Sequence, residues 1–271
     1  MKREYHISEY YANEKLFKIL EEDKIPYIDM DNRYFICDVY SDNERIDEIL
    51  ALLTKKPMVK VIFSEEEMES ANWYTFEATR WDIETGRPDF TYQYSCPYET
   101  STGTRYRHKK QINYCISKRT PKWKNNYNFC SINTGDFFDI YCSDLAKKMI
   151  TNRDIVGIKF NPVVNVKGVS TENVSQLVYS HKLPVSTFEF IREYREDVCP
   201  SCGYIQYSFR DPGEDNMRIL ADKFPEGIDF FVAEFQVRTG WGAYPVIVSK
   251  KMYDLVAKEM KEKHVRFKPI G

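Results

Sequence analysis

The sequence has few of the features that mark membrane, secreted or nucleotide-binding proteins. No stretch approaches the ~18 apolar residues of a membrane-spanning helix, and the N-terminal residues MKREYHISEYYANEKLF lack the apolar core of a signal peptide. Glycine is scarce, at 11 residues, and neither a GxGxxG nor a GxxxxGK[ST] phosphate loop occurs. We therefore expect a cytoplasmic protein that makes no contact with a membrane.

The cysteine content and the net charge also argue against particular classes of protein. The seven cysteines are an odd number, and most stand in hydrophobic runs such as YFICDVY, where cysteine acts as a small apolar residue, so a disulfide scaffold is not indicated. The 39 basic and 41 acidic residues give a net charge of −2, which supplies no field to attract nucleic acid. The hydrophobic share of 42%, of which aromatic residues are a large part, predicts a folded chain.

The first 65 residues read as an α/β unit. Residues 13–22 (NEKLFKILEE) predict a short amphipathic helix, and residues 34–40 (YFICDVY) predict a strand. Ile46, Ile49, Leu50 and Leu53 then form one apolar stripe of a helix that ends before Pro57. Residues 58–63 (MVKVIF) predict the next strand, and the acidic residues 64–70 (SEEEMES) a linker.

The following segment alternates bulky and polar residues from Trp73 to Tyr94, with turn residues from Gly86 to Asp89. This pattern is typical of an antiparallel hairpin.

The rest of the chain repeats itself, with residues 66–164 predicted as repeat 1 and residues 165–271 as repeat 2. A Thr-Gly pair, a strand, a serine, a helix and a strand of the form F-x-P follow one another twice. The separation between matching residues increases smoothly, from 103 at the Cys-Pro pairs through 104 at Pro121 and Pro225 to 106 at Ser143 and Ser249 and 107 at the F-x-P strands. We expect an α+β fold in which an N-terminal strand-helix-strand unit precedes two diverged, strand-rich repeats, each ending strand-helix-strand.

The most specific chemical motif is Cys199-Pro-Ser-Cys202-Gly203. Two thiolates on a tight turn are half of a tetrahedral zinc site. Repeat 1 has Cys96 and Glu99 at the matching positions, and Cys96 together with Glu99, His108 or Cys115 would complete the site. The alternatives are a redox pair and a reduced turn without metal. The cofactor prediction is therefore none, or one structural zinc.

Residues 105–129 mix cations with aromatic side chains, the composition of a surface for single-stranded nucleic acid. An acidic protein partner, or a solvated loop, explains the same composition. The binding residues predicted here and in the Thr-Gly-Trp-Gly segment are Arg105, Arg107, Lys109, Lys110, Trp123 and Trp241. None of the four histidines lies in a catalytic motif, so no catalytic residue is predicted and the chain is not expected to be an enzyme.

The C-terminal segment VIVSKKMYDLVAKEMKEKHVRFKPI, together with CPSCG, resembles the bacterial double-CXXCG-motif proteins and the related immunity proteins of polymorphic-toxin systems. The resemblance covers roughly residues 90–271, and the chain departs from it in having one CxxCG motif. It implies a non-enzymatic, protein-binding module that neutralises a toxin-like partner, with Cys199, Cys202 and Gly203 as a structural site. The alternatives are a nucleic-acid-binding protein that uses residues 105–129 and an enzyme of unknown class.

Overall fold

The computed structural model confirms an α+β fold, rich in strands and with few helices. It describes residues 2–10, 13–30, 33–55, 57–79, 81–83, 92–94, 109–111, 114–116, 121–124, 126–132, 140–165, 167–191, 193–198, 205–209, 217–238 and 245–270. The chain divides into two compact units, residues 1–70 and residues 71–212 with 216–271, and residues 213–215 lie outside the described ranges. Both predicted repeats thus belong to one unit. Among the described residues, no helix is long and apolar enough to cross a membrane.

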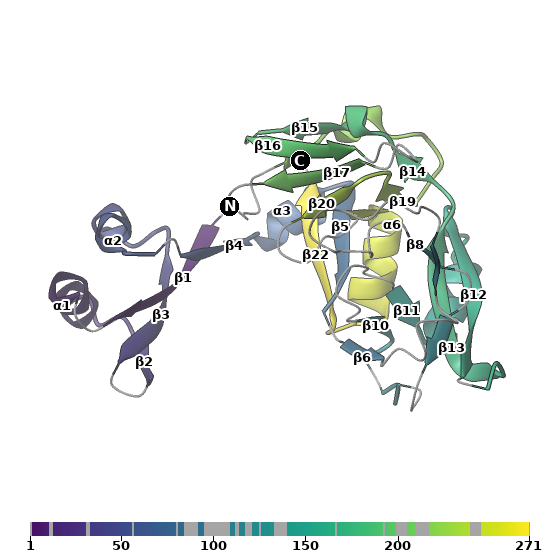
Figure 1. The fold of residues 1–271 in the computed structure, drawn as a ribbon, viewed down its shortest axis with the longest axis horizontal. Helices are drawn as coiled ribbons and strands as arrows, with labels where there is room; N and C mark the ends of the chain where they lie inside the picture. The colour runs from purple at the N-terminus through teal and green to yellow at the C-terminus, as the bar shows by residue number, and fades with distance from the viewer. Residues whose placement is uncertain are drawn as a thin grey trace. The chain divides into compact units, whose positions relative to one another are not determined.

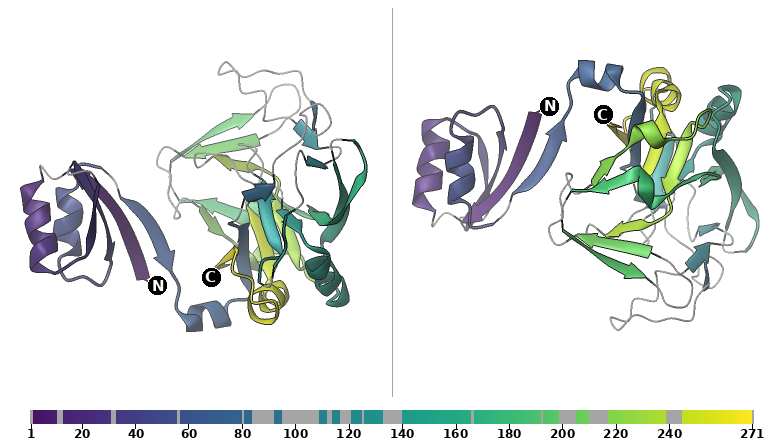
Figure 2. Two further views of the ribbon diagram at one scale, coloured as in Figure 1. Left: turned by 90° about the horizontal axis from the view of Figure 1, so that it is seen from below. Right: turned by 90° about the horizontal axis from the view of Figure 1, so that it is seen from above.

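The first unit is an antiparallel sheet covered by two helices on one face (Figures 1 and 2). Its elements are β1 (Lys2–Tyr10), α1 (Glu14–Glu22), β2 (Tyr27–Met30), β3 (Tyr34–Tyr40), α2 (Ile46–Leu52), β4 (Met58–Ile62) and α3 (Glu65–Ser70). The strand order is β2-β3-β1-β4, and every neighbouring pair is antiparallel. This βαββαβ order is the ferredoxin-like split βαβ arrangement.

The core of this unit lies between the sheet and the two helices. Side chains of α1 and α2 pack on one face of β1 and β3, and the buried set is Ile7, Leu16, Ile19, Leu20, Phe35, Cys37, Val39 and Ile49. The period-2 burial of β3 explains why YFICDVY carries alternate apolar residues. The opposite face of the sheet bears Tyr10, Ile28, Tyr40 and Met58, which are exposed.

Sequence analysis predicted α1, β3, α2 and β4 but missed the central strand β1. The reason is a buried charge within it, because Glu9 is only 2% exposed. Its carboxylate accepts hydrogen bonds from the Thr54 N–H (2.7 Å) and hydroxyl (2.6 Å) and from the Tyr10 N–H (3.0 Å). Burial alone would raise the pKa of Glu9, but these hydrogen bonds outweigh it and the pKa is lowered. Glu9 thereby connects β1 to the end of α2.

The predicted linker at residues 64–70 is wrong, because α3 occupies most of it. The Glu67 N–H donates to the Ser64 Oγ (3.1 Å), and the Ser64 N–H donates to the Glu67 carboxylate (2.8 Å). This reciprocal pair is a capping box, which starts a helix even in a strongly acidic segment.

The second unit contains two large sheets. One has the order β6-β10-β11-β13-β12-β9 and the other β14-β19-β21-β5-β22. The first consists of β6 (Trp81–Ile83), β9 (Tyr114–Ile116), β10 (Phe129–Ile132), β11 (Ile140–Cys142), β12 (Ile158–Asn165) and β13 (Ser170–Tyr179). The second consists of β5 (Trp73–Ala78), β14 (Lys182–Leu183), β19 (Phe230–Ala233), β21 (Val246–Ser249) and β22 (Val265–Ile270).

Smaller ladders and short helices complete the second unit. The ladders are β7 (Tyr92–Tyr94) with β8 (Lys109–Gln111), β15 (Phe188–Phe190) with β18 (Met217–Ile219), and β16 (Tyr194–Val198) with β17 (Ile205–Phe209) and β20 (Gln236–Arg238). Helix α5 (Asp144–Asn152) follows β11, and α6 (Lys250–Tyr253) with the π-helical segment η5 (Asp254–Glu259) follows β21. Two short 3-10 turns are η2 (Val185–Thr187) and η4 (Ala221–Lys223). Figure 1 shows α6 against β5 and β22.

Five strands of the first sheet match the five strands of the second in order, with β9 as the additional strand, and each sheet contains one strand from the other predicted repeat. Strand β13, from residues 165–271, lies between β11 and β12 of repeat 1. Strand β5, from residues 66–164, lies between β21 and β22 of repeat 2. In the first sheet Ser175 pairs with both Cys142 and Pro162, and in the second Tyr74 pairs with both Val248 and Pro269. The repeats therefore exchange strands reciprocally.

The separation between matching residues changes in steps. Strand pairing relates β10 to β19, β6 to β14 and β5 to β13 with a constant separation of 101 residues. The separation is 106 at the capping serines Ser143 and Ser249 and 107 in the last strands. The smooth increase predicted from Pro121 and Pro225 is therefore wrong, because an insertion in a connecting loop changes the separation all at once.

The final step from 106 to 107 coincides with η5. A π-helical turn holds about one residue more than an α-helical turn. The Met260 N–H donates to the Leu255 carbonyl, five residues back, at 2.9 Å. One additional residue in repeat 2 is thus accommodated within its helix.

The predicted hairpin between Trp73 and Tyr94 is also wrong in its pairing. The strands are present, but β5 pairs with β21 and β22, β6 pairs with β10, and β7 pairs with β8. Alternation of apolar and polar residues identifies a strand. Which strand it pairs with depends on packing against residues that are far away in the sequence.

Candidate functional site

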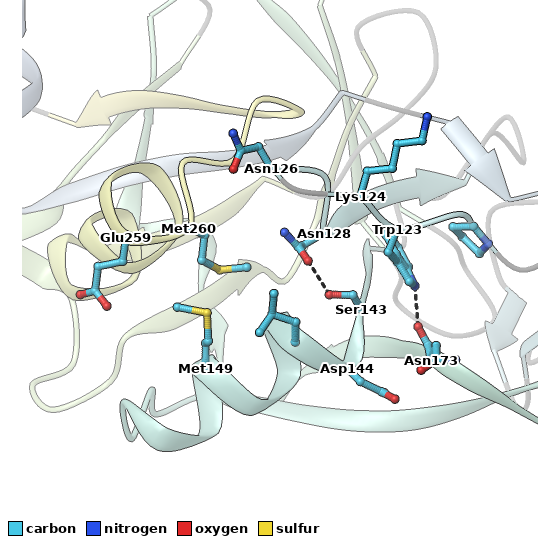
Figure 3. Close-up of a pocket in the computed structure, with 12 residues that line it drawn as sticks. Trp123, Lys124, Asn126, Asn128, Ser143, Asp144, Met149, Asn173, Glu259 and Met260 are labelled. Carbon is cyan, nitrogen blue, oxygen red and sulfur yellow. Dashed lines mark hydrogen bonds between the residues drawn. The ribbon is translucent and has the colours of Figure 1, made fainter.

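A pocket of about 630 Å³ in the second unit is the candidate site (Figure 3). It lies where the segment before β10, the start of α5, the beginning of β13 and the end of η5 meet. Its lining residues are Pro121, Trp123, Lys124, Asn126, Asn128, Ser143, Asp144, Leu145, Met149, Asn173, Glu259 and Met260. A volume of this size falls within the range of small-ligand and side-chain pockets.

Trp123 forms one wall of the pocket. Its indole N–H donates to the Asn173 carbonyl at 2.5 Å, which fixes the ring against the start of β13 (Figure 3). The ring centroid is 5.2 Å from that of Tyr127, which is buried in the core of the first sheet. The indole is therefore held rigidly, with one face on the protein core and the rest directed to the pocket.

Two asparagines with left-handed backbone conformations, Asn126 in a turn and Asn173 within β13, shape the rim. Asn126 has φ 62° and Asn173 has φ 65°. Asparagine is the non-glycine residue that most readily accepts this conformation. The turn at Asn126 is closed by the Tyr127 N–H, which donates to the Lys124 carbonyl at 3.0 Å. Both asparagine side chains thereby stand at the rim of the pocket.

A buried hydrogen-bond network supports the floor. The Ser143 hydroxyl donates to the Asn128 Oδ1 (2.7 Å) and accepts from the Ala146 N–H (3.1 Å), which caps α5. The Asn128 N–H and Nδ2 both donate to the Glu262 Oε2, at 2.6 and 3.3 Å. Because the Ser143 hydroxyl is engaged on both sides, it is a cap and not an activated nucleophile.

The remaining floor is apolar. Met149 and Met260 point toward each other (Figure 3), and Leu145, at the start of α5, is a further apolar lining residue. Leu145 is 57% exposed, whereas Met260 is buried. Methionine side chains adapt their shape to different apolar groups, so this floor suits an incoming aliphatic or aromatic side chain.

The matching position in repeat 2 is filled. Phe224 stands 101 residues after Trp123, and its ring packs against Trp73 and Phe231, at 4.9 and 5.5 Å. The carbonyl of Asn72, which matches Asn173, accepts from the Lys250 N–H at 2.8 Å. Repeat 1 instead binds this carbonyl with the Trp123 indole, so the pocket is a feature in which the repeats have diverged.

The described lining residues include no nucleophile paired with a base and no cluster of metal ligands. Its ionisable side chains are Lys124, Asp144 and Glu259, and Glu259 forms an ion pair with Arg153. Within the described ranges, no group of three His, Cys, Asp or Glu side chains lies close enough to hold a metal ion. An apolar floor with amide groups at the rim matches a polypeptide ligand, which offers apolar side chains and backbone amides.

Of the predicted binding residues, Trp123 lies in the pocket. Lys109 and Lys110 lie in β8, away from the pocket lining. The remaining predicted positions lie outside the described residues: Arg105, Arg107, Trp241, Cys96, Glu99, His108, Cys199, Cys202 and Gly203. Cys115 lies in β9. Zinc binding and the basic surface therefore stay predictions.

Sequence reasoning missed most of the pocket. Asn72 directly precedes β5 and Asn173 lies near the start of β13, 101 residues later, a signal that would have identified the exchanged strands. Met149 and Met260 carry no signal, because a methionine on a helix is far more often core than pocket. Searches with family models and against curated proteins found no match to this chain.

Proposed function

We propose that the chain is a non-enzymatic protein-binding module, and that the Trp123 pocket receives a side chain of its partner. The observation that carries the proposal is the combination of a rigid indole and two methionines with asparagine side chains at the rim. Interface hot spots commonly consist of tryptophan set in a desolvated, well-packed pocket. The resemblance to immunity proteins suggests a toxin as the partner.

The alternatives have less support. An enzyme needs a nucleophile or an acid–base pair within hydrogen-bond reach of a substrate, and the lining of the Trp123 pocket offers neither. A nucleic-acid site needs a track of cations, and Lys124 is the single lysine among the lining residues.

The test compares two exposed aliphatic residues of the same unit. Leu145 (57% exposed) lines the pocket, and Ile191 (60% exposed) does not. Tagged full-length protein carrying Leu145→Asp, Ile191→Asp or neither change is used to capture proteins from the source cells. We expect one protein that wild type and Ile191→Asp retain and that Leu145→Asp retains about tenfold less.

The captured protein is then expressed alone and together with the chain. Growth arrest that the chain relieves and Leu145→Asp does not relieve would support the immunity-like function. Equal capture by all three proteins, or capture of nothing, would contradict the proposed site.

A further inference from the structure

The first unit carries a second hollow, separate from the Trp123 pocket, which we name the β3 hollow. It measures about 710 Å³ and is lined by His6, Lys24, Ile25, Pro26, Tyr27, Ile28, Ile36, Cys37, Asp38, Val39, Tyr40, Asp42 and Asn43. All of these residues belong to the first unit. It lies along the outer edge of β3, beyond the point where β2 begins.

The hollow exists because β2 is too short for β3. Strand β2 pairs with β3 from Tyr27, opposite Cys37, to Met30, opposite Tyr34. The next pair would place Pro26 opposite Asp38, and proline has no N–H with which to continue the ladder. The edge of β3 from Asp38 to Tyr40 therefore has no strand beside it within the described part of the unit.

The backbone of this edge is oriented for pairing. The Ser41 N–H donates to the Arg3 carbonyl at 2.8 Å, so Ser41 directs its N–H toward β1. Because alternate residues of an antiparallel strand point to opposite sides, the Asp38 backbone N–H and carbonyl point away from β1, toward the hollow. These are the groups that an added strand would bond.

The side chains around this edge include exposed apolar groups and charged groups that have partners nearby. Ile28 is 64% exposed and Tyr40 is 40% exposed. The His6 Nδ1 lies 2.7 Å from the Asp38 carboxylate, and Lys2 forms an ion pair with Asp42 at 2.7 Å. The Lys2 Nζ also lies 4.3 Å from the centre of the Tyr40 ring. Lys2 thus pairs with Asp42, while the lining itself carries the carboxylates of Asp38 and Asp42 against a single lysine, Lys24.

The same charges argue against a nucleic acid. Aromatic side chains on a four-stranded sheet of this topology resemble the surface of an RNA-binding sheet. Here, however, the carboxylates of Asp38 and Asp42 line the hollow, where they would repel a phosphate backbone. An extended polypeptide has no such conflict.

We infer that the β3 hollow binds an extended, aliphatic segment of a partner protein, which adds as a short strand along Asp38–Tyr40 in line with β2. Main-chain hydrogen bonds to β3 would provide affinity, and Ile28 and Tyr40 would select alternate aliphatic side chains of the segment. This surface is additional to the proposed Trp123 site and does not depend on it.

The experiment pans a library of random displayed peptides on the full-length protein. We expect enriched peptides with alternating aliphatic residues, and their synthetic versions should bind about tenfold more weakly to Ile28→Glu and to Tyr40→Ala. Met58→Glu is the matched control, because Met58 is 69% exposed on the same sheet but lies outside the hollow. N-methylation of one backbone amide of the peptide should weaken binding about tenfold.

Four results would overturn the inference. They are the enrichment of no peptide, equal weakening by Met58→Glu, full affinity of every N-methylated peptide, and binding of a single-stranded oligonucleotide that Tyr40→Ala abolishes. Leu145→Asp should bind the peptides normally. A failure of the Trp123 site and a failure of the β3 hollow are therefore distinguishable.

Discussion

The two repeats share a hydrogen bond between the helix-capping serine and a strand, but the residue that accepts it differs in charge. In each, the serine that caps the helix donates its hydroxyl to the residue before an inner strand, Ser143 to Asn128 and Ser249 to Asp229, both at 2.7 Å. Asn128 faces the carboxylate of Glu262, whereas Asp229 faces the Lys251 ammonium at 3.4 Å. Both repeats keep the accepting position and its hydrogen bond to the serine. The charge of the accepting residue differs, and it suits the charge of the neighbouring side chain.

Each position has one neighbour from the opposite repeat, although Lys251 belongs to the same repeat as Asp229. The loop after η5 brings Glu262 to Asn128, and the loop after α5 brings Val156 to Asp229, whose Oδ2 accepts the Val156 N–H at 3.0 Å. The loops also bind the exchanged strands, since Gly157 accepts from the Ser180 N–H and His264 from the Thr79 N–H. A duplicated position therefore diverges with the groups that lie beside it, whether they come from its own repeat or from the other one.

The largest expected effect is at Gly157, which matches His264. Gly157 has φ +106°, and a Cβ there would lie 2.4 Å from the Phe230 carbonyl oxygen. Gly157→Ala should lower the free energy of unfolding by about 4 kcal/mol, measured by urea denaturation. Gly227→Ala is the control, because its φ is +73° with nothing within 4 Å, and should cost about 1 kcal/mol. Equal losses would mean that the contact with Phe230 is unimportant.

The second-largest effect on stability is expected when Asn128, which accepts a hydrogen bond from the Ser143 hydroxyl, is given the residue type found at Asp229. Asn128→Asp places a second carboxylate against buried Glu262 and should cost about 3 kcal/mol at pH 7. Urea denaturation measures this loss as a decrease in the free energy of unfolding relative to wild type.

The reciprocal change is expected to be mild. In Asp229→Asn the amide oxygen can still accept from the Val156 N–H, and the amide NH2 can donate to the Ser249 hydroxyl oxygen in place of the original bond. The variant loses an ion pair with the half-exposed Lys251, so about 1 kcal/mol is expected. Urea denaturation curves at pH 7 compare the two variants. Equal losses would show that local charge does not explain the divergence.

The smallest effect on stability is expected at an ion pair that joins matching positions of the two repeats. Arg153 and Glu259 are 106 residues apart, as the capping serines are, and they form an ion pair with each other. Either Arg153→Glu or Glu259→Arg should cost about 0.5 kcal/mol because both side chains are substantially exposed. The double variant should regain the wild-type stability in a double-mutant cycle, and additive losses would show that the pair is not coupled.

The sequence predicted elements better than it predicted their partners. Local patterns identified β3 and α2, and the serine before each repeat helix was recognised as a cap, because apolar spacing and capping act within a few residues. Strand exchange could not be predicted in this way, because pairing between β5 and β22 depends on residues nearly 200 positions apart. The misassigned Pro121 and Pro225 show that two identical residues are weaker support than a shared register.

The candidate site could be predicted only in part. Trp123 was identified from composition, but the pocket depends on the methionines and asparagines that the exchanged strand and the π-helical turn bring together. These residue types are common in ordinary cores and turns, so no local pattern distinguishes them. The β3 hollow was missed because β2 was missed, and with it the role of Pro26.

Strand exchange also has a consequence for synthesis on the ribosome. Strand β5 (Trp73–Ala78) is made early, yet both of its neighbours, β21 and β22, lie in the last 26 positions of the chain. At about 5–20 residues per second, β5 waits roughly 10–40 s for a partner. During that interval it carries two unpaired edges and the aromatic side chains of Trp73, Tyr74 and Phe76, a combination that favours aggregation. The first unit can complete its own sheet in the same period, so the chain is expected to need a chaperone mainly for the segment that begins at β5.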